Sequence, residues 1–536
     1  MKTEFKSLNT VEPQETKREI SSDRQLYLPR GGINVRSTSE ALLAAKQPAG
    51  RFSSPLTPLD RLTLDFRQRI AEISETERGD SVLFDDPTYP VGPQWQAVLN
   101  YLRKQGVIAS PRVLIEGVFH DEPKLFSLRL FAQYGRNDTD GYTTMTPGYS
   151  RGISDNFEEA LSKVIGELLE RYPLTIYRRR NLIRASMQSL ARAGKRFLNI
   201  HDLTGFSDWQ QELLPERKFD ETSDFHWVEG VELLSGKPAL IPAQLVYWNY
   251  DTRQEPAEPH LREQNTNGAA GHFTYEESIL AAIYENIQRD AFLIHWLNNI
   301  PPSRIDPNNI DHPAIRRLLD EYKRYGLEVV LLNTTLDLGV PSCIAVLIDV
   351  SGRGPRIALG GGCDPDFGSA LLRSVTEVWS IHHWLRLRGE TETFTLAEPY
   401  QPFRDNGLGQ WQRCLLWADD NMFPHFEPFL RGPLQAFQDA VPKFSSSFAS
   451  PKEELDAVLR VFRALGREYK VYAYEAKHEI LSTLGYHSVR VVIPGLVPIY
   501  MREGNAPLAA PRLRETPIKK GHQSAREFIS WPHPFP

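Results

Sequence analysis

Cysteine is scarce in this chain, and its scarcity limits the kinds of site that the sequence can hold. The three cysteines among 536 residues are Cys343, Cys363 and Cys414, and no two of them form a C-x-x-C pair. A disulfide framework or a structural zinc site needs cysteines in close, paired spacing. The spacing therefore argues against both classes of protein.

Long apolar runs and an excess of positive charge are also missing. The longest apolar candidate, residues 329–350, is interrupted by Asn333, Asp337 and Pro341, so no stretch reaches transmembrane length. The first residues lack the apolar core of a signal peptide. The net charge of -6, without a long basic run, gives no support to nucleic-acid binding. We expect a cytoplasmic protein with neither a membrane nor a nucleic-acid partner.

The composition that remains, 41% hydrophobic and 24% charged, is typical of a globular protein. Residues 1–85 are polar and irregular, which predicts an N-terminal extension that is partly disordered or contacts a partner. Residues 86–536 form the predicted globular domain. Its expected helices are 157–171, 276–297, 313–325 and 368–387, and its expected strands include 239–247, 328–332 and 344–350. This order predicts an α/β (α+β) fold with mixed sheets backed by helices and a proline-rich C-terminal tail.

One local pattern occurs three times: a glycine-bearing loop runs into an amphipathic helix that carries carboxylates and an arginine. The loops are Tyr149–Gly152, Thr266–Gly271 and Gly360–Pro365. The helices that follow carry, in order, Glu167, Glu170 and Arg171; Glu285, Gln288 and Arg289; and Arg373 and Glu377. Backbone N–H groups of such loops approach phosphates, and carboxylates hold the Mg²⁺ ions of a triphosphate. The pattern predicts a nucleotide-triphosphate site built from separate segments.

Capping residues predict where these helices begin. Asp155 with Glu158, and Thr274 with Glu277, have the spacing of a capping box, and Asp364 precedes a proline at the start of the third helix. By this spacing, Glu277 fits a capping residue better than a metal ligand. Taken singly, each Glu–Arg pair also fits an exposed pair on a helix face. The functional prediction therefore rests on the threefold association.

Taken together, these segments resemble the YcaO family. Three motifs of that family have matches in this chain. The motif S-x-x-x-E-x-x-E-R is matched at Glu167, Glu170 and Arg171, and the motif R-x-x-x-E is matched at Arg373 and Glu377. The motif S-N-G-x-A with a following E-x-x-E-R-D is matched at Asn267, Gly268, Glu285, Arg289 and Asp290. Thr266 stands for the serine of the second motif, and Gln288 stands for its second glutamate. The resemblance covers residues 140–536 and implies a YcaO-type fold.

The resemblance implies that the chain binds ATP with Mg²⁺. The metal-binding positions that it implies are Glu167, Glu170, Glu277, Glu285 and Gln288. The implied ATP contacts are Arg151, Asn267, Arg289, Arg373 and Glu377, of which the last two are also implied to be catalytic. The implied chemistry is activation of a peptide amide. A nucleophile adds to the amide carbon, ATP phosphorylates the resulting oxygen, and phosphate leaves.

The end of the sequence narrows the resemblance to the azoline-forming cyclodehydratases of the family, the SagD-like D-proteins. Pro532, Pro534 and Pro536 match their P-x-P-x-P ending, and the segment 489–496 also looks like them. Members of this branch cyclise Cys, Ser or Thr of a ribosomally made precursor peptide to thiazoline or oxazoline. Prolines stiffen an extended tail, which would place the carboxylate of Pro536 in the active site as a general base.

Two other functions stay open. A YcaO enzyme that forms a thioamide or an amidine shares the ATP site but commonly lacks the proline tail. A non-catalytic ATP-binding scaffold for a partner subunit fits Gln288 and Lys163, which replace a glutamate and a serine of the family motifs. For a cyclodehydratase, the expected partners are the precursor peptide, a separate ubiquitin-activating-like (ThiF-like) protein that binds its leader, a flavin-dependent azoline dehydrogenase, and a second copy of this chain.

Overall fold

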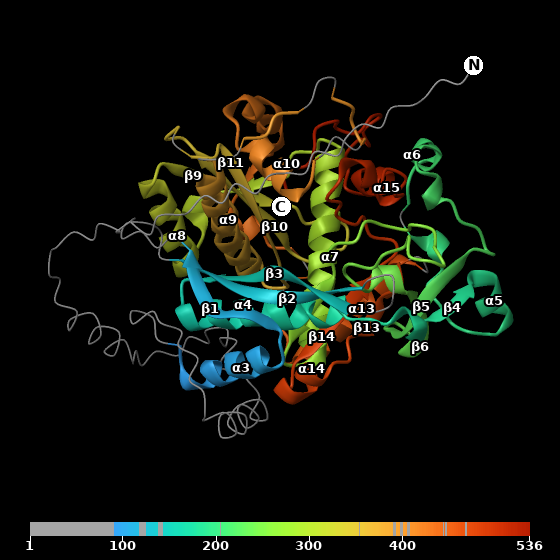
Figure 1. The fold of residues 1–536 in the computed structure, drawn as a ribbon. Coiled ribbons are helices and arrows are strands. Elements are labelled where there is room, and N and C mark those ends of the chain that lie inside the picture. Colours follow the sequence, from blue (N-terminus) through green and yellow to red (C-terminus); the bar gives the residue numbers. More distant parts are fainter. Residues whose placement is uncertain are drawn as a thin grey trace, which may run out of the picture. The chain divides into compact units, whose positions relative to one another are not determined.

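The computed structural model describes residues 91–116, 125–137, 143–203, 205–352, 354–389, 393–396, 400–404, 408–442, 444, 447–466 and 469–536. The extension expected over residues 1–85 lies outside this part of the chain. Within the described residues, no helix combines the length and the apolarity needed to cross a membrane. Figure 1 shows the elements in space.

The first sheet is antiparallel and has the strand order β1–β2–β3. The elements of this region are α3 (Pro93–Lys104), β1 (Ile108–Glu116), β2 (Phe126–Asn137), β3 (Thr143–Ser154) and α4 (Phe157–Arg171). The N-cap of α4 is Asn156, whose side chain accepts the N–H of Glu159 at 3.1 Å. The capping box predicted one residue earlier is therefore wrong. Asp155 instead pairs with Arg317, a partner distant in sequence.

The second sheet has the order β11–β10–β9–β8–β12, antiparallel except for the β8–β12 pair. Its strands are β8 (Ser303–Ile305), β9 (Leu327–Asn333), β10 (Ser342–Asp349), β11 (Ile357–Cys363) and β12 (Leu434–Gln435). The helices of this region are α8 (Pro313–Arg324), α9 (Phe367–Gly389), α10 (Gln410–Trp417), α11 (Phe423–Phe426) and α12 (Phe437–Ala440).

The third sheet has the order β4–β5–β13–β14–β7, with β6 added beside β5. Its strands are β4 (Ile183–Ser186), β5 (Asp224–Glu232), β6 (Lys237–Pro242), β7 (Ala269–His272), β13 (Tyr472–Glu475) and β14 (His487–Val492). The helices are α5 (Met187–Arg192), α6 (Asp208–Leu213), α7 (Tyr275–Leu297), α13 (Pro451–Leu465), α14 (Glu479–Leu484) and α15 (Arg512–Lys519).

The predicted strand 239–247 is half wrong. β6 ends at Pro242, and residues Ala243–Leu245 form a 3₁₀ turn. The apolar run continues because these turn residues are buried, and burial selects apolar residues in a turn as it does in a strand.

The glycine-bearing segments lie in strands or directly beside them, where the sequence predicted loops. Tyr149–Gly152 lies in β3, the glycines at 360–362 lie in β11, and β7 follows Gly268 directly. Glycine is required because the next helix crosses its own strand closely. A Cβ on Gly152 would lie 2.1 Å from the carbonyl oxygen of Ala160 in α4. Gly152, Gly360 and Gly362 therefore let helix and strand pack closely, and phosphate binding by these segments stays a prediction.

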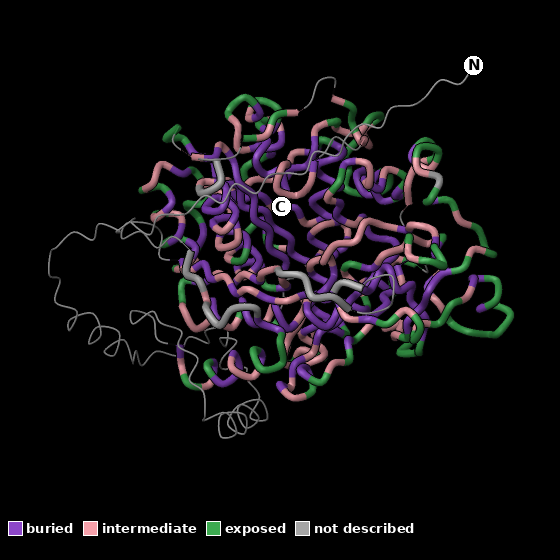
Figure 2. Tube along the Cα trace, in the orientation of Figure 1, coloured by how far each residue is buried: buried purple, intermediate pink, exposed green. Residues whose placement is uncertain are grey.

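The helices α4, α7 and α9 each lie between two sheets. α4 contacts the first sheet and strands β7 and β14 of the third, α7 contacts the third and second sheets, and α9 contacts the second sheet and β3. Figure 1 shows α7 running through the middle of this arrangement. Figure 2 shows buried chain concentrated there and exposed chain around α5. Because each helix bridges two sheets, side chains from all three can meet.

Candidate functional site: an acidic cluster beside an apolar cavity

The strand–helix units β3–α4, β7–α7 and β11–α9 share one contact, in which a backbone N–H near the strand's glycine donates to a glutamate of the helix. The pairs are Arg151 with Glu167, Gly268 with Glu285 at 2.7 Å, and Gly361 with Glu377 at 3.0 Å. A backbone N–H favours the ionised form of the carboxyl that accepts it. The units therefore present equivalent carboxylates. Together with Glu170 we call them the acidic cluster.

An arginine one helical turn beyond the glutamate offsets its charge in α4 and α7. Arg171 Nη2 lies 2.5 Å from Glu167 Oε1, and Arg289 Nη2 lies 3.4 Å from Glu285 Oε1. The side chains of the second pair are only 13% and 27% exposed. Partial burial strengthens the attraction relative to a solvated pair on a helix face. These Arg–Glu pairs therefore belong to a site formed between helices and strands and are not exposed pairs on a helix face.

Glu170 is held partly in the acid form by its surroundings. Burial raises the pKa of its carboxyl to about 8, Arg171 opposes that rise, and the charges of Glu167 and Glu285 add to it. Since Glu285 belongs to α7, carboxyl groups of two helices act on each other here. A bound cation would favour the ionised form of Glu170.

Glu377 brings α9 into the same electrostatic environment. Burial raises the pKa of its carboxyl, the guanidinium of Arg289 and the N–H of Gly361 oppose that rise, and Glu285 adds to it. The acidic cluster thus couples α4, α7 and α9.

The acidic cluster is not a complete metal site by itself. Among the described residues, no group of three or more His, Cys, Asp or Glu side chains can hold a metal ion. Mg²⁺ commonly takes one or two carboxylates and completes its shell with water and phosphate oxygens. Carboxylates that repel one another, as Glu167, Glu170 and Glu285 do, suit such partial ligation.

Arg373 and Glu277 make other contacts. Arg373 Nη2 lies 2.9 Å from Asp364 Oδ2, and its side chain is 60% exposed. Glu277 Oε2 accepts the hydroxyl of Thr274 at 2.7 Å and lies 2.7 Å from His272 Nδ1. Its N–H donates to the hydroxyl of Thr274, so Thr274 is confirmed as the N-cap of α7. Direct roles of both residues at ATP stay predictions.

Gln288 and Asn267 border the cluster. Gln288 is buried in α7, and its amide stands against β11, where a Cβ on Gly361 would lie 2.0 Å from its Nε2. Asn267 Nδ2 donates to Asn286 Oδ1 of α7 at 3.3 Å. Both amides are thus fixed to α7 beside the carboxylates.

A cavity of about 240 Å³ opens beside Glu167 and Glu170. Its walls come from α3, α4, β7 and the chain around Tyr486, and their apolar side chains include Trp95, Val98, Ile165, Leu169 and Phe273. The rings of Phe273 and Tyr486 meet edge to face at 5.2 Å. Lys163, which replaces a serine of the family motif, also lines the cavity. An aromatic-walled cavity next to carboxylates suits a nucleobase whose phosphates are neutralised nearby.

The proline tail is buried from Pro532 to Pro536. The ring centroid of Phe535 lies 4.3 Å from Arg289 Cζ and 5.0 Å from the ring of Phe292. Stacking on a guanidinium that also pairs with Glu285 places the tail at the edge of the acidic cluster.

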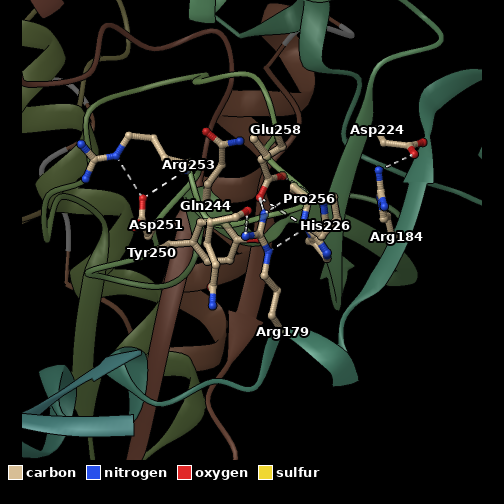
Figure 3. A network of polar contacts seen from close by, with 12 residues as sticks. Arg179, Arg184, Asp224, His226, Gln244, Tyr250, Asp251, Arg253, Pro256 and Glu258 are labelled. Atoms are coloured by element: carbon tan, nitrogen blue, oxygen red, sulfur yellow. Dashed lines mark hydrogen bonds and ion pairs between the residues drawn. The ribbon is translucent and has the colours of Figure 1, made fainter. Parts of the chain in front are cut away.

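A buried network holds the segment that leads into β7 (Figure 3). Arg179 Nη2 lies 3.2 Å from Glu258 Oε1 and donates to the carbonyl oxygen of Pro256 at 2.9 Å. Glu258 Oε2 accepts the N–H of His226 in β5 at 3.0 Å. Because both charges are almost fully buried, this pairing ties the segment to the third sheet.

Sequence reasoning gave Arg490 no role, although it lies on β14 facing the cluster. Its Nε donates to the carbonyl oxygen of Leu245 at 3.1 Å. Burial lowers the pKa of its guanidinium to about 10, and the charges of Glu285 and Glu170 oppose that change. A cation in the middle of an apolar run, residues 489–493, was the available indication. Burying a charge is costly unless an opposite charge lies nearby.

Solved structures share this fold. A heterocyclase in complex with substrate and cofactor aligns with a TM-score of 0.62 and 21% identity, over 82% of this chain and 57% of that chain. YcaO from Methanopyrus kandleri, bound with AMPPCP and Mg²⁺, aligns with a TM-score of 0.53 and 17% identity, over 77% and 93%. At such identities the likeness shows the fold alone.

Sequence comparison gives the family. An uncharacterised protein in the tfuA 3′ region of Rhizobium leguminosarum bv. trifolii is 33% identical over 160 residues, which are 28% of this chain and 37% of that protein. The chain thus spans little more than a third of this relative and little more than half of the heterocyclase chain. The family model described as YcaO cyclodehydratase, ATP- and Mg²⁺-binding, matches residues 151–497. Since that match takes in more than half of the chain and includes the whole acidic cluster, the chain belongs to the YcaO family.

Proposed function

We propose that this chain is an ATP-dependent cyclodehydratase that converts Cys, Ser or Thr of a precursor peptide to thiazoline or oxazoline. The observation that carries the proposal is the double contact of Arg289, which pairs with Glu285 of the acidic cluster and lies against Phe535 of the proline tail. The acidic cluster and the proline tail therefore meet at one side chain, which supports a phosphoryl-transfer site beside a tail typical of azoline-forming members.

ATP suits the combination of cavity and cluster. The apolar walls suit the adenine, and the carboxylates of Glu167, Glu170 and Glu285 suit Mg²⁺ shared with the phosphates. Bound Mg²⁺ would neutralise charge on the transferred phosphoryl group. Gln288 and Glu277 complete the proposed metal-binding set. The proposed phosphate and ribose contacts are Arg151, Asn267, Arg289, Arg373 and Glu377.

The proposed reaction removes one water from the peptide. The thiol or hydroxyl of the side chain adds to the preceding amide carbon and loses its proton to a base. The resulting oxyanion takes the γ-phosphoryl group of ATP and releases ADP. The amide nitrogen then loses its proton and forms the C=N bond as phosphate departs. Arg289 lies where a cation can stabilise the oxyanion and the departing phosphate.

Pro536 is the proposed base. It is buried and directly follows Phe535, which packs on Arg289. A carboxylate there would take the proton of the attacking thiol or hydroxyl. Removal of this single residue tests the role, because the contacts of residues 531–535 stay in place.

The proposed partners are the precursor peptide, a ThiF-like protein that binds its leader, a flavin-dependent azoline dehydrogenase that acts afterwards, and a second copy of this chain. One structural neighbour is a heterocyclase in complex with substrate and cofactor, which is compatible with a peptide partner at this fold.

Mass spectrometry of a Cys/Ser/Thr-rich precursor peptide tests the proposal. The peptide is incubated with ATP, Mg²⁺, this chain and the ThiF-like partner. We expect a loss of about 18 Da per ring with one ADP and one phosphate released, and no loss with Glu285→Gln. An unchanged peptide mass, with ATP bound but not hydrolysed, would support the scaffold function. A gain of mass matching sulfur in place of oxygen would support thioamide formation.

A further inference from the structure

The proline tail lies against α10 and α7 through contacts of two kinds. The first kind fixes the backbone. Trp417 Nε1 donates to the carbonyl oxygen of Pro532 at 2.9 Å, and Trp296 Nε1 donates to that of Trp531 at 3.3 Å. An indole N–H can donate to the backbone whatever the side chain at these positions, because every residue has a carbonyl group.

The second kind of contact selects a side chain. His533 Nε2 lies 2.8 Å from Arg413 Nη1 of α10, and both side chains are fully buried. Arg413 Nη1 also donates to the carbonyl oxygen of Tyr500 at 2.8 Å. A guanidinium group only donates hydrogen bonds. His533 Nε2 also lies 2.8 Å from the carbonyl oxygen of Tyr500, so Arg413 and His533 share this oxygen, and the three groups form one buried polar contact.

The surroundings of His533 favour the neutral form of its ring. Arg413 Nη1 lies 3.6 Å from Glu503 Oε1, and both side chains are 0% exposed. Burial lowers the pKa of His533 well below its usual value, and the cations Arg413 and Arg289 add to that effect. The carboxyl of Glu503 thus lies beside Arg413, while burial keeps the imidazole of His533 uncharged.

We propose that Arg413 is a positioning residue that binds His533 and thereby holds Phe535 against Arg289. The inference rests on the proposed function for its kinetic consequence, but the hold on the tail is a property of the chain itself. No contact between Arg413 and the acidic cluster is found among the described residues, so its influence on the site passes through the tail. The separation of one residue between His533 and Phe535 makes that coupling short.

Substitutions at His533 separate the position of the polar group from size. In His533→Gln, the side-chain amide, which carries both an acceptor and a donor, reaches the position of Nε2, whereas in His533→Asn it reaches only that of Nδ1. We expect His533→Gln to keep kcat within about threefold of the parent and His533→Asn and His533→Leu to lose about tenfold or more. The KM for ATP should stay within about twofold in all of them, since the cavity is untouched.

Hydrogen exchange of residues 529–535 in the full chain gives a readout that needs no turnover. We expect faster exchange of the tail amides in His533→Asn and Arg413→Met, and parent-like exchange in His533→Gln. Cys414→Ala is the matched control, because Cys414 is buried on the same helix and packs into the core beneath the second sheet. Arg413→Met leaves Glu503 buried without its cation and can unfold the chain. The test of the proposal therefore rests on the His533 variants.

Equal exchange and equal kcat for His533→Gln and His533→Asn would overturn the proposal, because packing alone would then explain the tail. If the parent fails to cyclise any peptide, the proposed function falls while the exchange experiment still decides the positioning role. Unequal exchange with equal kcat would also overturn it, since the tail would then move without affecting the site.

Discussion

At the scale of single residues, the site holds carboxyl groups in buried positions, where their charged form lowers the stability of the fold. Burial, with the added charges of Glu167 and Glu285, raises the pKa of Glu170 to about 8, although Arg171 opposes that rise. Such crowding is typical of positions that a ligand or metal completes, and functional sites commonly give up stability for it. The free protein should therefore gain stability when one of these carboxyl groups is neutralised.

We predict that Glu170→Gln stabilises the protein free of nucleotide at pH 8 and abolishes turnover. The pKa of Glu170 rises from 4.5 to about 8 on folding, so the folded state binds more protons and loses stability as the pH rises between these values. After allowance for partial solvent access, the variant should gain ~1–2 kcal/mol at pH 8 and almost nothing at pH 4.5. Urea unfolding at both pH values measures this difference. A gain that shrinks toward pH 8 would contradict it.

At the scale of elements, the site depends on how closely a helix can cross its own strand. Gly360 and Gly362 of β11 face α9, where a Cβ would lie 2.2 Å from the backbone nitrogen of Val378 and 1.9 Å from the carbonyl oxygen of Ala370. Gly361 between them faces the cluster, because successive residues of a strand point to opposite sides. One strand thus supports the helix on one side and the site on the other.

We predict that Gly361→Ala and Gly362→Ala fail in different ways. Gly362→Ala should cost ~3 kcal/mol of stability, because its Cβ would meet helix backbone. Gly361→Ala should cost about 1 kcal/mol or less but lower kcat about tenfold, because its Cβ would displace the flexible side chains of Gln288 and Phe535. Thermal unfolding and peptide turnover measure the two effects.

The control for this pair is Gly205→Ala. The nearest atom to a Cβ on Gly205 lies 3.7 Å away, in ordinary contact. This variant should therefore match the parent in both stability and turnover. Equal loss of stability in Gly361→Ala and Gly362→Ala would show that the two faces of β11 are not distinct in this way.

At the scale of the whole molecule, α7 links the site to the rest of the chain. A buried ion triad joins Asp290 of α7 to α15 and to the chain after β9. Arg512 Nη2 lies 2.7 Å from Asp290 Oδ2 and 2.7 Å from Asp337 Oδ1. Asp290 also accepts the N–H of Val497 at 2.9 Å. Segments far apart in sequence are thereby fixed to the helix that carries Glu285.

We predict that Arg512→Met destabilises the protein by ~3–5 kcal/mol, because Asp290 then stays buried without its cation. Lys519→Met on the same helix is the control, since Lys519 and Glu515 form an exposed pair at 3.5 Å that should contribute less than ~0.5 kcal/mol. Urea unfolding of both variants gives the comparison. Similar midpoints for the two would contradict a structural role of the triad.

The helices could be predicted well from the sequence. The predicted helix 157–171 matches α4, and those at 276–297, 313–325 and 368–387 differ from α7, α8 and α9 by one or two residues. The cap at Thr274 is confirmed, whereas that of α4 is Asn156 instead of Asp155. Both residue types can cap a helix, and in this structure the carboxylate of Asp155 instead forms an ion pair with Arg317.

The candidate site could be predicted only in part. The motifs grouped Glu167, Glu285 and Glu377, and the structure brings these three side chains into one electrostatic environment. The participation of Arg490 and of α3 could not be inferred from any motif, because it depends on which strand and which helix close the cavity. Strand pairing over hundreds of residues is set by packing and not by local pattern.

By itself, the sequence determined the helices α4, α7, α8 and α9, their polar faces and the family, because helical periodicity and caps depend on neighbours within a few residues. Only the tertiary structure decided that Gly152 and the glycines at 360–362 lie in strands, that α4, α7 and α9 each lie between two sheets, and that His533 meets Arg413. Those outcomes depend on contacts between residues distant in sequence. Burial and close packing choose such contacts after the local elements exist.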